Sequence, residues 1–344
     1  MHSTSLFLLI VGVSLSLAVP TVKLPNGLRG QELVDQINKD GQWKAALHPR
    51  FTGKTIEQIR GHLGAIRKPR QKKLPEKFKN SYEHIPASFD ARINWPQCAD
   101  VVGHIYDQSI CSNSWAVSAA ATMSDHLCIA TNGTNKTPIS AIDITSCCKD
   151  CGNCKGGDTY EAFDWIYTHG ISSGSDYSTD SYCKPYPFAP CEHNNKTAYQ
   201  TCEDVANTLQ CSKSCQKGYK DRTYSQDKFY SHGIVLTWIN VKEIQRVIMA
   251  YGSTTATFDV YEDFLYYQSG VYQHNTGKDK PIGSLAVRMI GWGTENGVDY
   301  WLLANQWNSD WGDKGLGKFI RGIDNCGVES YVVTGQIDTS RLPK

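Results

Sequence analysis

The chain has 344 residues, of which 40% are hydrophobic and 20% are charged. This composition is typical of one or two globular domains with a sizeable apolar core. The formal net charge is only +1, so the composition argues against a nucleic acid or an anionic membrane as a partner.

Residues 5–18 form a short apolar stretch that ends in Ser16-Leu17-Ala18. Small residues at that end are typical of the cleavage site of a secretory signal peptide. The stretch is too short to span a bilayer, and no other run is apolar enough to do so. We therefore expect residues 1–18 to be a signal peptide and no segment to span a membrane.

A polar segment without cysteine follows, from residue 19 to residue 84. Leu33, Val34 and Ile37 lie at helical spacing within it, which predicts a short amphipathic helix over residues 32–39. Residues 67–73 are basic and contain proline, so we expect an accessible site for proteolysis there. An unstructured linker is the alternative interpretation of the whole segment.

The clearest helical pattern begins at Ser114. Small and apolar residues recur every three or four positions as far as Leu127, and Asn132-Gly133 ends the pattern. Ser114 is therefore expected at a helix amino terminus, where the helix dipole stabilises an anion.

The rest of the chain changes from loops to strands. Residues 147–215 are rich in cysteine, glycine, serine and asparagine, which predicts loops held by disulfides. A helical pattern covers residues 241–249, and strand-like runs then dominate. These runs are residues 253–260, 285–291 and 300–304.

Thirteen cysteines lie between Cys98 and Cys326. Their number indicates an oxidising compartment and a disulfide framework, although sequence alone does not assign the pairs. A metal site is the alternative, but the cysteines are spread too widely to favour one. We expect no metal and no cofactor. Three Asn-x-Ser/Thr sequons, at Asn132, Asn135 and Asn195, predict surface glycosylation.

Several motifs resemble those of cathepsin B-type cysteine peptidases of the papain family. They are Asp107-Gln-Ser-Ile-Cys-Ser-Asn-Ser-Trp-Ala116, Gly283-Ser-Leu-Ala-Val-Arg288 and the block of residues 291–313. The resemblance implies a papain-like two-domain α+β fold, in which a helical left domain faces a β-barrel-like right domain across a cleft. It also implies that residues 19–84 are a propeptide and that residues 85–344 are the peptidase domain.

The resemblance implies four catalytic positions, of which two carry the wrong residue. In the family a cysteine attacks the peptide carbonyl, a histidine transfers the proton, an asparagine fixes the imidazole, and a glutamine helps bind the oxyanion. Gln108 and Asn305 match the two supporting positions, whereas Ser114 stands in place of the cysteine and Leu285 in place of the histidine. The motifs therefore predict a protease scaffold without its reactive groups.

A serine nucleophile is the alternative interpretation of Ser114. A hydroxyl needs a positioned base, and the side chain of Leu285 cannot act as one. The local sequence also lacks the glycines of a Gly-x-Ser-x-Gly elbow. An engineered cysteine-to-serine trap fits poorly, because other positions near the site depart from the family as well. They are Ser112, Asn113, Ser284 and Gln306.

The resemblance also implies substrate-binding positions. Gly156 and Gly157 match the segment whose backbone pairs with an extended peptide, although an ordinary turn is the alternative. Trp307 is placed to shield Asn305 from water. Tyr331 stands at the base of the S2 pocket, where cathepsin B members often carry a glutamate, so a preference for basic side chains is expected to be lost.

Residues 191–202 match the occluding loop of cathepsin B, in which two adjacent histidines bind a substrate carboxylate. This chain keeps His193 but has Asn194 in the second position, and a purely structural loop is the alternative. The same resemblance implies six disulfides and leaves Cys326 unpaired. The implied pairs are Cys98–Cys128, Cys111–Cys154, Cys147–Cys211, Cys148–Cys151, Cys183–Cys215 and Cys191–Cys202.

These observations predict a secreted or lysosomal pseudopeptidase that acts as a monomer. We expect it to bind peptides, a propeptide or proteinaceous inhibitors of cysteine proteases without cleaving them. A residual peptidase, with its base supplied by another histidine, and a structural matrix glycoprotein are the two alternatives.

Overall fold

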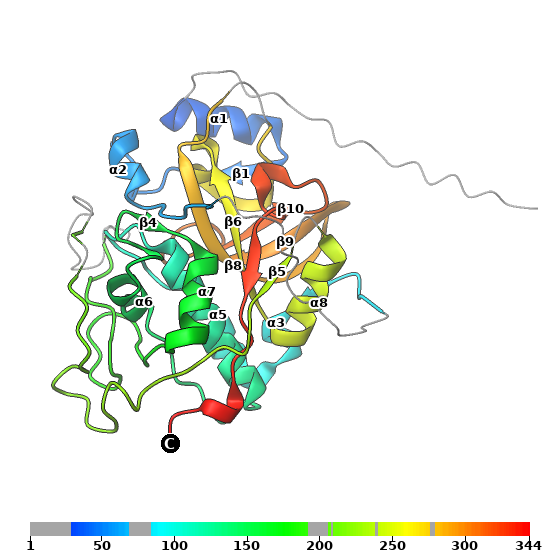
Figure 1. The fold of residues 1–344 in the computed structure, drawn as a ribbon. Helices are drawn as coiled ribbons and strands as arrows, with labels where there is room; N and C mark the ends of the chain where they lie inside the picture. Colours follow the sequence, from blue (N-terminus) through cyan, green and yellow to red (C-terminus); the bar gives the residue numbers. More distant parts are fainter. Residues whose placement is uncertain (1–28, 69–83, 192–205, 208, 238–239, 276–278) are drawn as a thin grey trace, which may run out of the picture.

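The computed structural model describes residues 29–68, 84–191, 206–207, 209–237, 240–275 and 279–344. The expected signal peptide lies outside these residues. Two units of different architecture, one helical and one a β-sheet, lie side by side in the described part of the chain (Figure 1).

The helical unit is organised around α5 (Ser114–Ala130). Helices α6 (Ala141–Cys147) and α7 (Thr159–His169) pack against α5, and their apolar side chains share one core with it. Because α5 is buried over most of its length, small residues such as Ala119 and Ala120 let the neighbouring helices approach. The helix expected to begin at Ser114 is therefore confirmed.

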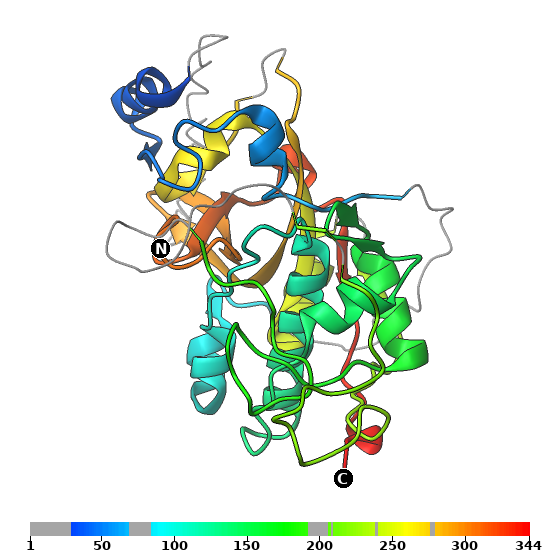
Figure 2. The same cartoon turned by 90° about the vertical axis from the view of Figure 1, so that its left-hand side faces the viewer.

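Short elements complete this unit. The helices α3 (Ala91–Asn94) and α4 (Ala99–Val102) precede α5, with η1 (Pro96–Cys98) between them. A two-stranded ribbon of β3 (Gly152–Asn153) and β4 (Gly156–Gly157) lies between α6 and α7. Figure 2 shows the helices of this unit from the side, with long loops running over them.

The second unit is a nine-stranded sheet with the order β1-β7-β10-β9-β8-β6-β11-β5, and β2 pairs with β8 beside this path. The longest strand is β8 (Gly283–Glu295), which lies between β6 (Thr254–Val260) and β9 (Val298–Ala304). The remaining strands are β2 (Phe89–Asp90), β5 (Val235–Thr237), β7 (Tyr267–Tyr272), β10 (Leu316–Ile320) and β11 (Val332–Thr334). Strands β6, β8 and β9 fit the three runs expected from the sequence, the other strands were not predicted, and α8 (Val241–Tyr251) fits the expected helix.

Three 3₁₀ turns belong to the second half of the chain. They are η2 (Glu262–Tyr266), η3 (Asn325–Gly327) and η4 (Thr339–Arg341). The largest hydrophobic core lies under this sheet and is rich in aromatic side chains, among them Phe258, Trp301 and Trp307.

The amino-terminal segment folds onto this second unit. Helix α1 (Gly30–Asp40) contributes Leu33, Val34 and Ile37 to the large core, so the amphipathic helix expected from the sequence is confirmed. Strand β1 (Trp43–Ala45) extends the sheet by pairing with β7, and α2 (Ile56–Arg60) follows it. An unstructured linker therefore does not describe residues 30–68, because apolar side chains such as Trp43, Phe51 and Leu63 are buried in the core of the sheet unit.

Five of the six expected disulfides are present: Cys98–Cys128, Cys111–Cys154, Cys147–Cys211, Cys148–Cys151 and Cys183–Cys215. Cys191 is disulfide-bonded, and its expected partner Cys202 lies outside the described residues. Cys326 is a buried free thiol.

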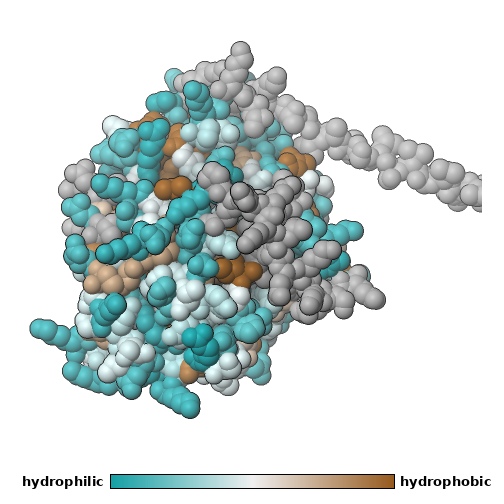
Figure 3. All heavy atoms as spheres, viewed as in Figure 1, coloured by the Kyte–Doolittle hydropathy of each residue, from teal (hydrophilic) through white to brown (hydrophobic). Residues whose placement is uncertain are grey.

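The surface in the view of Figure 3 is mostly hydrophilic, with small separate apolar patches. None of the helices in the described residues combines the length and apolarity needed to cross a bilayer.

Candidate functional site

Ser114 lies at the first position of α5 and is completely buried. Its hydroxyl oxygen accepts a hydrogen bond from the main-chain N–H of Ala286 in β8, with an N–O distance of 3.3 Å. Among the described residues no side-chain base hydrogen-bonds to this hydroxyl. The Ala286 N–H is a hydrogen-bond donor to the hydroxyl. Activation of an alcohol requires the opposite, a hydrogen-bond acceptor that takes the proton of the hydroxyl.

Leu285 lies in β8, next to the strand residue that binds the Ser114 hydroxyl. It pairs in register with Phe258 of β6, is completely buried, and belongs to the large apolar core. Leu63 from the amino-terminal segment is part of the same core. The position expected for the histidine is thus occupied by packed hydrocarbon.

The two supporting residues are buried in this region. Gln108 donates from Nε2 to the main-chain oxygens of Leu63, at 3.1 Å, and Cys111, at 3.0 Å. Asn305 accepts a hydrogen bond from the N–H of Gln306, but its Nδ2 has no hydrogen-bond partner among the described residues. An unpaired buried donor of this kind costs about 1–3 kcal/mol.

The amino-terminal segment lies across Ser114 and its neighbours and hydrogen-bonds through its main chain. Gly157 of β4 donates to the oxygen of Gly64 at 3.0 Å and accepts from the N–H of Ile66 at 2.7 Å. Between them, Ala65 donates to the oxygen of Ser284 at 3.1 Å. The segment therefore bridges the helical unit and the sheet as an extended strand.

This segment approaches the protein closely at Gly64. A Cβ atom built there would lie 2.1 Å from the carbonyl oxygen of Ser112, and the φ angle of Gly64 is +112°. Both facts require glycine. Ser112 also donates from its hydroxyl to the oxygen of Gly61 at 2.6 Å, so its side chain binds the segment.

Aromatic and imidazole groups cover the same segment. Trp307 is completely buried, and its indole N–H donates to the oxygen of His62 at 2.8 Å, while Phe51 packs edge-on against both rings. Burial, reinforced by the positive charge of Arg50, lowers the pKa of His62 to about 3. His62 is therefore neutral at mildly acidic pH as well as at neutral pH.

Asp158 and Tyr331 form a hydrogen-bonded pair next to β4. The hydroxyl of Tyr331 lies 3.0 Å from both carboxylate oxygens of Asp158. The same carboxylate caps α7 through the N–H groups of Tyr160 and Glu161, and it accepts from the N–H of Lys68 at 2.9 Å. Tyr331 thus takes part in a buried polar network, which sequence reasoning did not anticipate because Asp158 matched no motif.

The remaining predicted positions are divided between the surface and the undescribed residues. Asn132 is exposed and Asn135 is partly exposed. His193, Asn194 and Asn195 lie outside the described residues, so the expected occluding loop and the third sequon stay predictions. Within the described ranges, no group of three or more histidine, cysteine, aspartate or glutamate residues could hold a metal ion.

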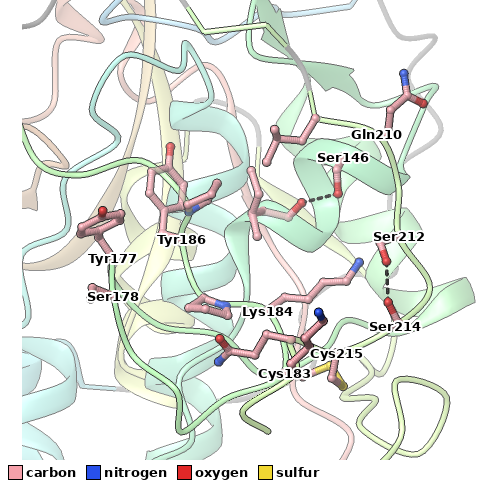
Figure 4. A pocket seen from close by; sticks show the side chains of 16 residues that line it. Ser146, Tyr177, Ser178, Cys183, Lys184, Tyr186, Gln210, Ser212, Ser214 and Cys215 are labelled. Carbon is pink, nitrogen blue, oxygen red and sulfur yellow. Dashed lines mark hydrogen bonds between the residues drawn. A yellow bond between two sulfur atoms is a disulfide. The ribbon is translucent and has the colours of Figure 1, made fainter.

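A separate pocket of about 490 Å³ lies on the helical unit, between α6 and the loops around the Cys183–Cys215 disulfide (Figure 4). Hydroxyl and apolar side chains line it, including Tyr177, Tyr186 and Ser214. None of the four predicted catalytic positions lines this pocket.

Comparison with known proteins identifies the family of this fold. Residues 85–336 match the model of the papain family cysteine proteases. The chain belongs to the papain family. The matched range begins at residue 85, and the amino-terminal segment precedes it.

Within the papain family, the similar relatives are of the cathepsin B type. The chain is 42% identical to the cathepsin B-like cysteine proteinase 6 of Caenorhabditis elegans, over 90% of this chain and 83% of that protein. It is also 42% identical to the cathepsin B-like cysteine proteinase of Schistosoma japonicum, over 90% of this chain and 91% of that protein.

Solved structures of precursor forms share the fold. Procathepsin B S9 from Trypanosoma congolense superposes with a TM-score of 0.77 at 32% identity, over 90% of this chain and 99% of that one. Procathepsin L 3 from the larval midgut of Tenebrio molitor superposes with a TM-score of 0.63 at 21% identity, over 88% of this chain and 85% of that one. The chain is therefore a cathepsin B-like papain-family protein with an amino-terminal propeptide region.

Proposed function

We propose that this protein is a secreted or lysosomal pseudopeptidase, which binds extended peptide segments in its cleft and does not hydrolyse them. The observation that carries the proposal is the environment of Ser114. Its hydroxyl receives a hydrogen bond from Ala286, and the neighbouring Leu285 is buried in apolar core. Peptide hydrolysis requires one proton to be removed from the nucleophile and one to be delivered to the leaving amine. Without a base, no side chain can carry either proton.

The cysteines offer no replacement nucleophile in the described residues. Cys326 is the free thiol, and burial raises its pKa well above that of an ordinary thiol. Cys191 is disulfide-bonded. A thiolate is the reactive form of cysteine, and neither of these residues supplies one.

Retained contacts support binding in the cleft over a purely structural role. Gln108 and Gly157 hydrogen-bond to the main chain of residues 63–66, independently of the side chains there. Such main-chain pairing is how extended peptides are bound as an added strand. We expect peptides, the propeptide itself and inhibitors that insert into papain-like clefts to be the ligands, and the protein to act as a monomer.

The test combines an activity assay with a restoration experiment. Purified protein is assayed with a fluorogenic dipeptide substrate and with an epoxide that labels reactive thiols, before and after an added protease cuts within residues 69–83. We expect turnover on the order of a millionfold below that of an intact peptidase, no labelling, and a precursor that stays full length at acidic pH unless the protease is added. The double variant Ser114→Cys/Leu285→His should gain measurable activity and labelling, whereas Ser114→Cys alone should gain much less of both.

Hydrolysis by the unaltered protein that disappears in Ser114→Ala would contradict the proposal and favour a residual serine-based peptidase. A chain that is inactive but binds no peptide after removal of the propeptide would favour the structural alternative.

A further inference from the structure

Arg67 of the amino-terminal segment forms an ion pair with Asp259 of β6. Each of the two side chains is about one third exposed or less, so the pair is partly shielded from water. It follows the main-chain pairing of Ala65 with Gly157 and Ser284 by only two residues. A side chain of the bound strand is therefore held as well as its backbone.

Three residues form the site that the Arg67 side chain occupies. Asp259 provides the carboxylate, and Ser284 of β8, which pairs with it in register, donates from its hydroxyl to the same carboxylate oxygen at 2.9 Å. Gly327, at the end of η3, provides the space, because a Cβ atom there would lie 2.8 Å from a guanidinium nitrogen of Arg67. The hydroxyl orients the carboxylate toward the cation, and the glycine leaves room for it.

The hydroxyl of Ser284 distinguishes this arrangement from the one that the family resemblance implies. The resemblance to cathepsin B places a glycine at this position, and a glycine has no hydroxyl with which to orient Asp259. The departure from the family pattern therefore has a structural consequence other than relaxation of an unused site. The hydroxyl of Tyr331, at the expected base of the S2 pocket, is hydrogen-bonded to Asp158. The carboxylate that binds the basic side chain of Arg67 is instead that of Asp259, one strand away.

We propose that Asp259 and Ser284 make the cleft selective for extended peptides that carry an arginine two residues after the residue paired with Gly157. This inference rests on the proposed function, peptide binding in the cleft, and specifies the ligand. Residues 64–68, Gly-Ala-Ile-Arg-Lys, are the internal example of such a ligand. Removal of the propeptide vacates the Asp259 carboxylate for an arginine of another chain.

The first arm of the test uses the full chain, cut within residues 69–83 after folding. Release of the amino-terminal segment is followed by gel filtration for the unaltered protein, Asp259→Asn, Arg67→Gln and the double variant. We expect each single change to weaken retention about tenfold, as for a charged hydrogen bond at a partly exposed site, and the double variant to be little worse than either. Additive effects of the two changes would overturn the pairing.

The second arm measures binding of two fluorescent peptides to the cut chain after the segment has been removed. One has the sequence of residues 61–68, and the other differs only by Arg67→Gln. We expect the arginine peptide to bind about tenfold more tightly, and Asp259→Asn to remove this difference. Ser284→Ala should reduce the difference to about threefold, because an oriented carboxylate is lost but the charge remains.

Asp176→Asn is the matched control, because Asp176 is half exposed and pairs with His104 in the described residues. It changes the net charge equally and should leave the preference intact. Equal binding of both peptides by the unaltered protein would overturn this inference alone. Binding of neither peptide would instead contradict the proposed function.

Discussion

At the scale of single residues, Leu285 is important because it provides packing where the family resemblance implies a catalytic base. A histidine at this position would be partly polar and would need a partner, whereas Leu285 is completely buried beside Phe258. Its hydrocarbon adds to the core, and a fully buried leucine contributes about 1.5–3 kcal/mol. In the proposed function, Leu285 therefore exchanges a catalytic base for packing.

Truncation of Leu285 tests this packing role. We expect Leu285→Ala to lower the free energy of unfolding by about 2–5 kcal/mol, because the change leaves a cavity in the core. Chemical denaturation of the full chain gives the measurement. The control is Ile93→Ala, at a side chain that is 79% exposed, which should change the free energy by no more than about 0.5 kcal/mol. Similar values for both variants would show that Leu285 is not part of a tight core.

Asn305 shows the other side of that exchange. Its Nδ2 is buried without a partner in the described residues, at the position where the family's asparagine orients the histidine. In the proposed function, the unpaired amide is what remains when one member of a catalytic pair is replaced and the other is kept. Its cost of about 1–3 kcal/mol offsets part of the gain from Leu285.

At the scale of elements, the propeptide is held by β1, by the strand at residues 64–66 and by groups buried between them. His62 is one of these groups, with a pKa lowered to about 3 by burial and by Arg50; Asp107 opposes the shift, and Lys54 adds to it. His48, which contacts the main-chain oxygen of Tyr267, also has a pKa lowered by burial. Both residues bind the domain as neutral imidazoles.

Acidification should therefore weaken the docking of the propeptide. The pKa of His62 is about 3 when docked and near 6.5 when released, so the neutral form favours docking, and protons are taken up on release. The stabilisation is complete above about pH 6.5 and is lost progressively as the pH falls toward 3, by up to about tenfold in affinity per pH unit. Release from the cut chain, measured between pH 7 and pH 4, tests this expectation.

His62→Phe is the informative variant, because the Nδ1 atom of His62 has no hydrogen-bond partner among the described residues. The variant should release its propeptide with a shallower dependence on pH, and His48 should account for part of the slope that remains. An unchanged slope would mean that other groups control the release.

At the scale of the whole molecule, the two units are stabilised differently, one by disulfides and the other by apolar packing. All five described disulfides lie between Cys98 and Cys215, where long loops surround α5, α6 and α7. The sheet unit is stabilised instead by a large aromatic core. Cross-links are most useful where regular structure is sparse, because they reduce the entropy of the unfolded chain.

The buried Cys326 provides a test of this arrangement. Burial and the neighbouring Asp263 and Asp259 raise the pKa of its thiol, so the native protein should react with iodoacetamide far more slowly than a free thiol does. Unfolding without reductant should expose one reactive thiol per chain, and reduction should expose all thirteen. Rapid labelling of the native protein, or a second thiol in the unreduced chain, would contradict the pairing of Cys191 with Cys202 or the burial of Cys326.

Local pattern was enough to predict the helix at Ser114 and three of the strands, because these depend on periodicity within short stretches of chain. The family motifs predicted the family, and the five disulfides followed only from that resemblance. The residues at positions 114 and 285, on which the proposed function depends, can also be read directly from the sequence. The interactions of Arg67, Ser112, Ser284 and Asp158 could not be, since each joins segments far apart in the chain. The tertiary structure alone decided how the propeptide is held, because only folding brings Ser112, the main chain of Ser284 and the carboxylate of Asp158 within hydrogen-bonding distance of residues 61–68.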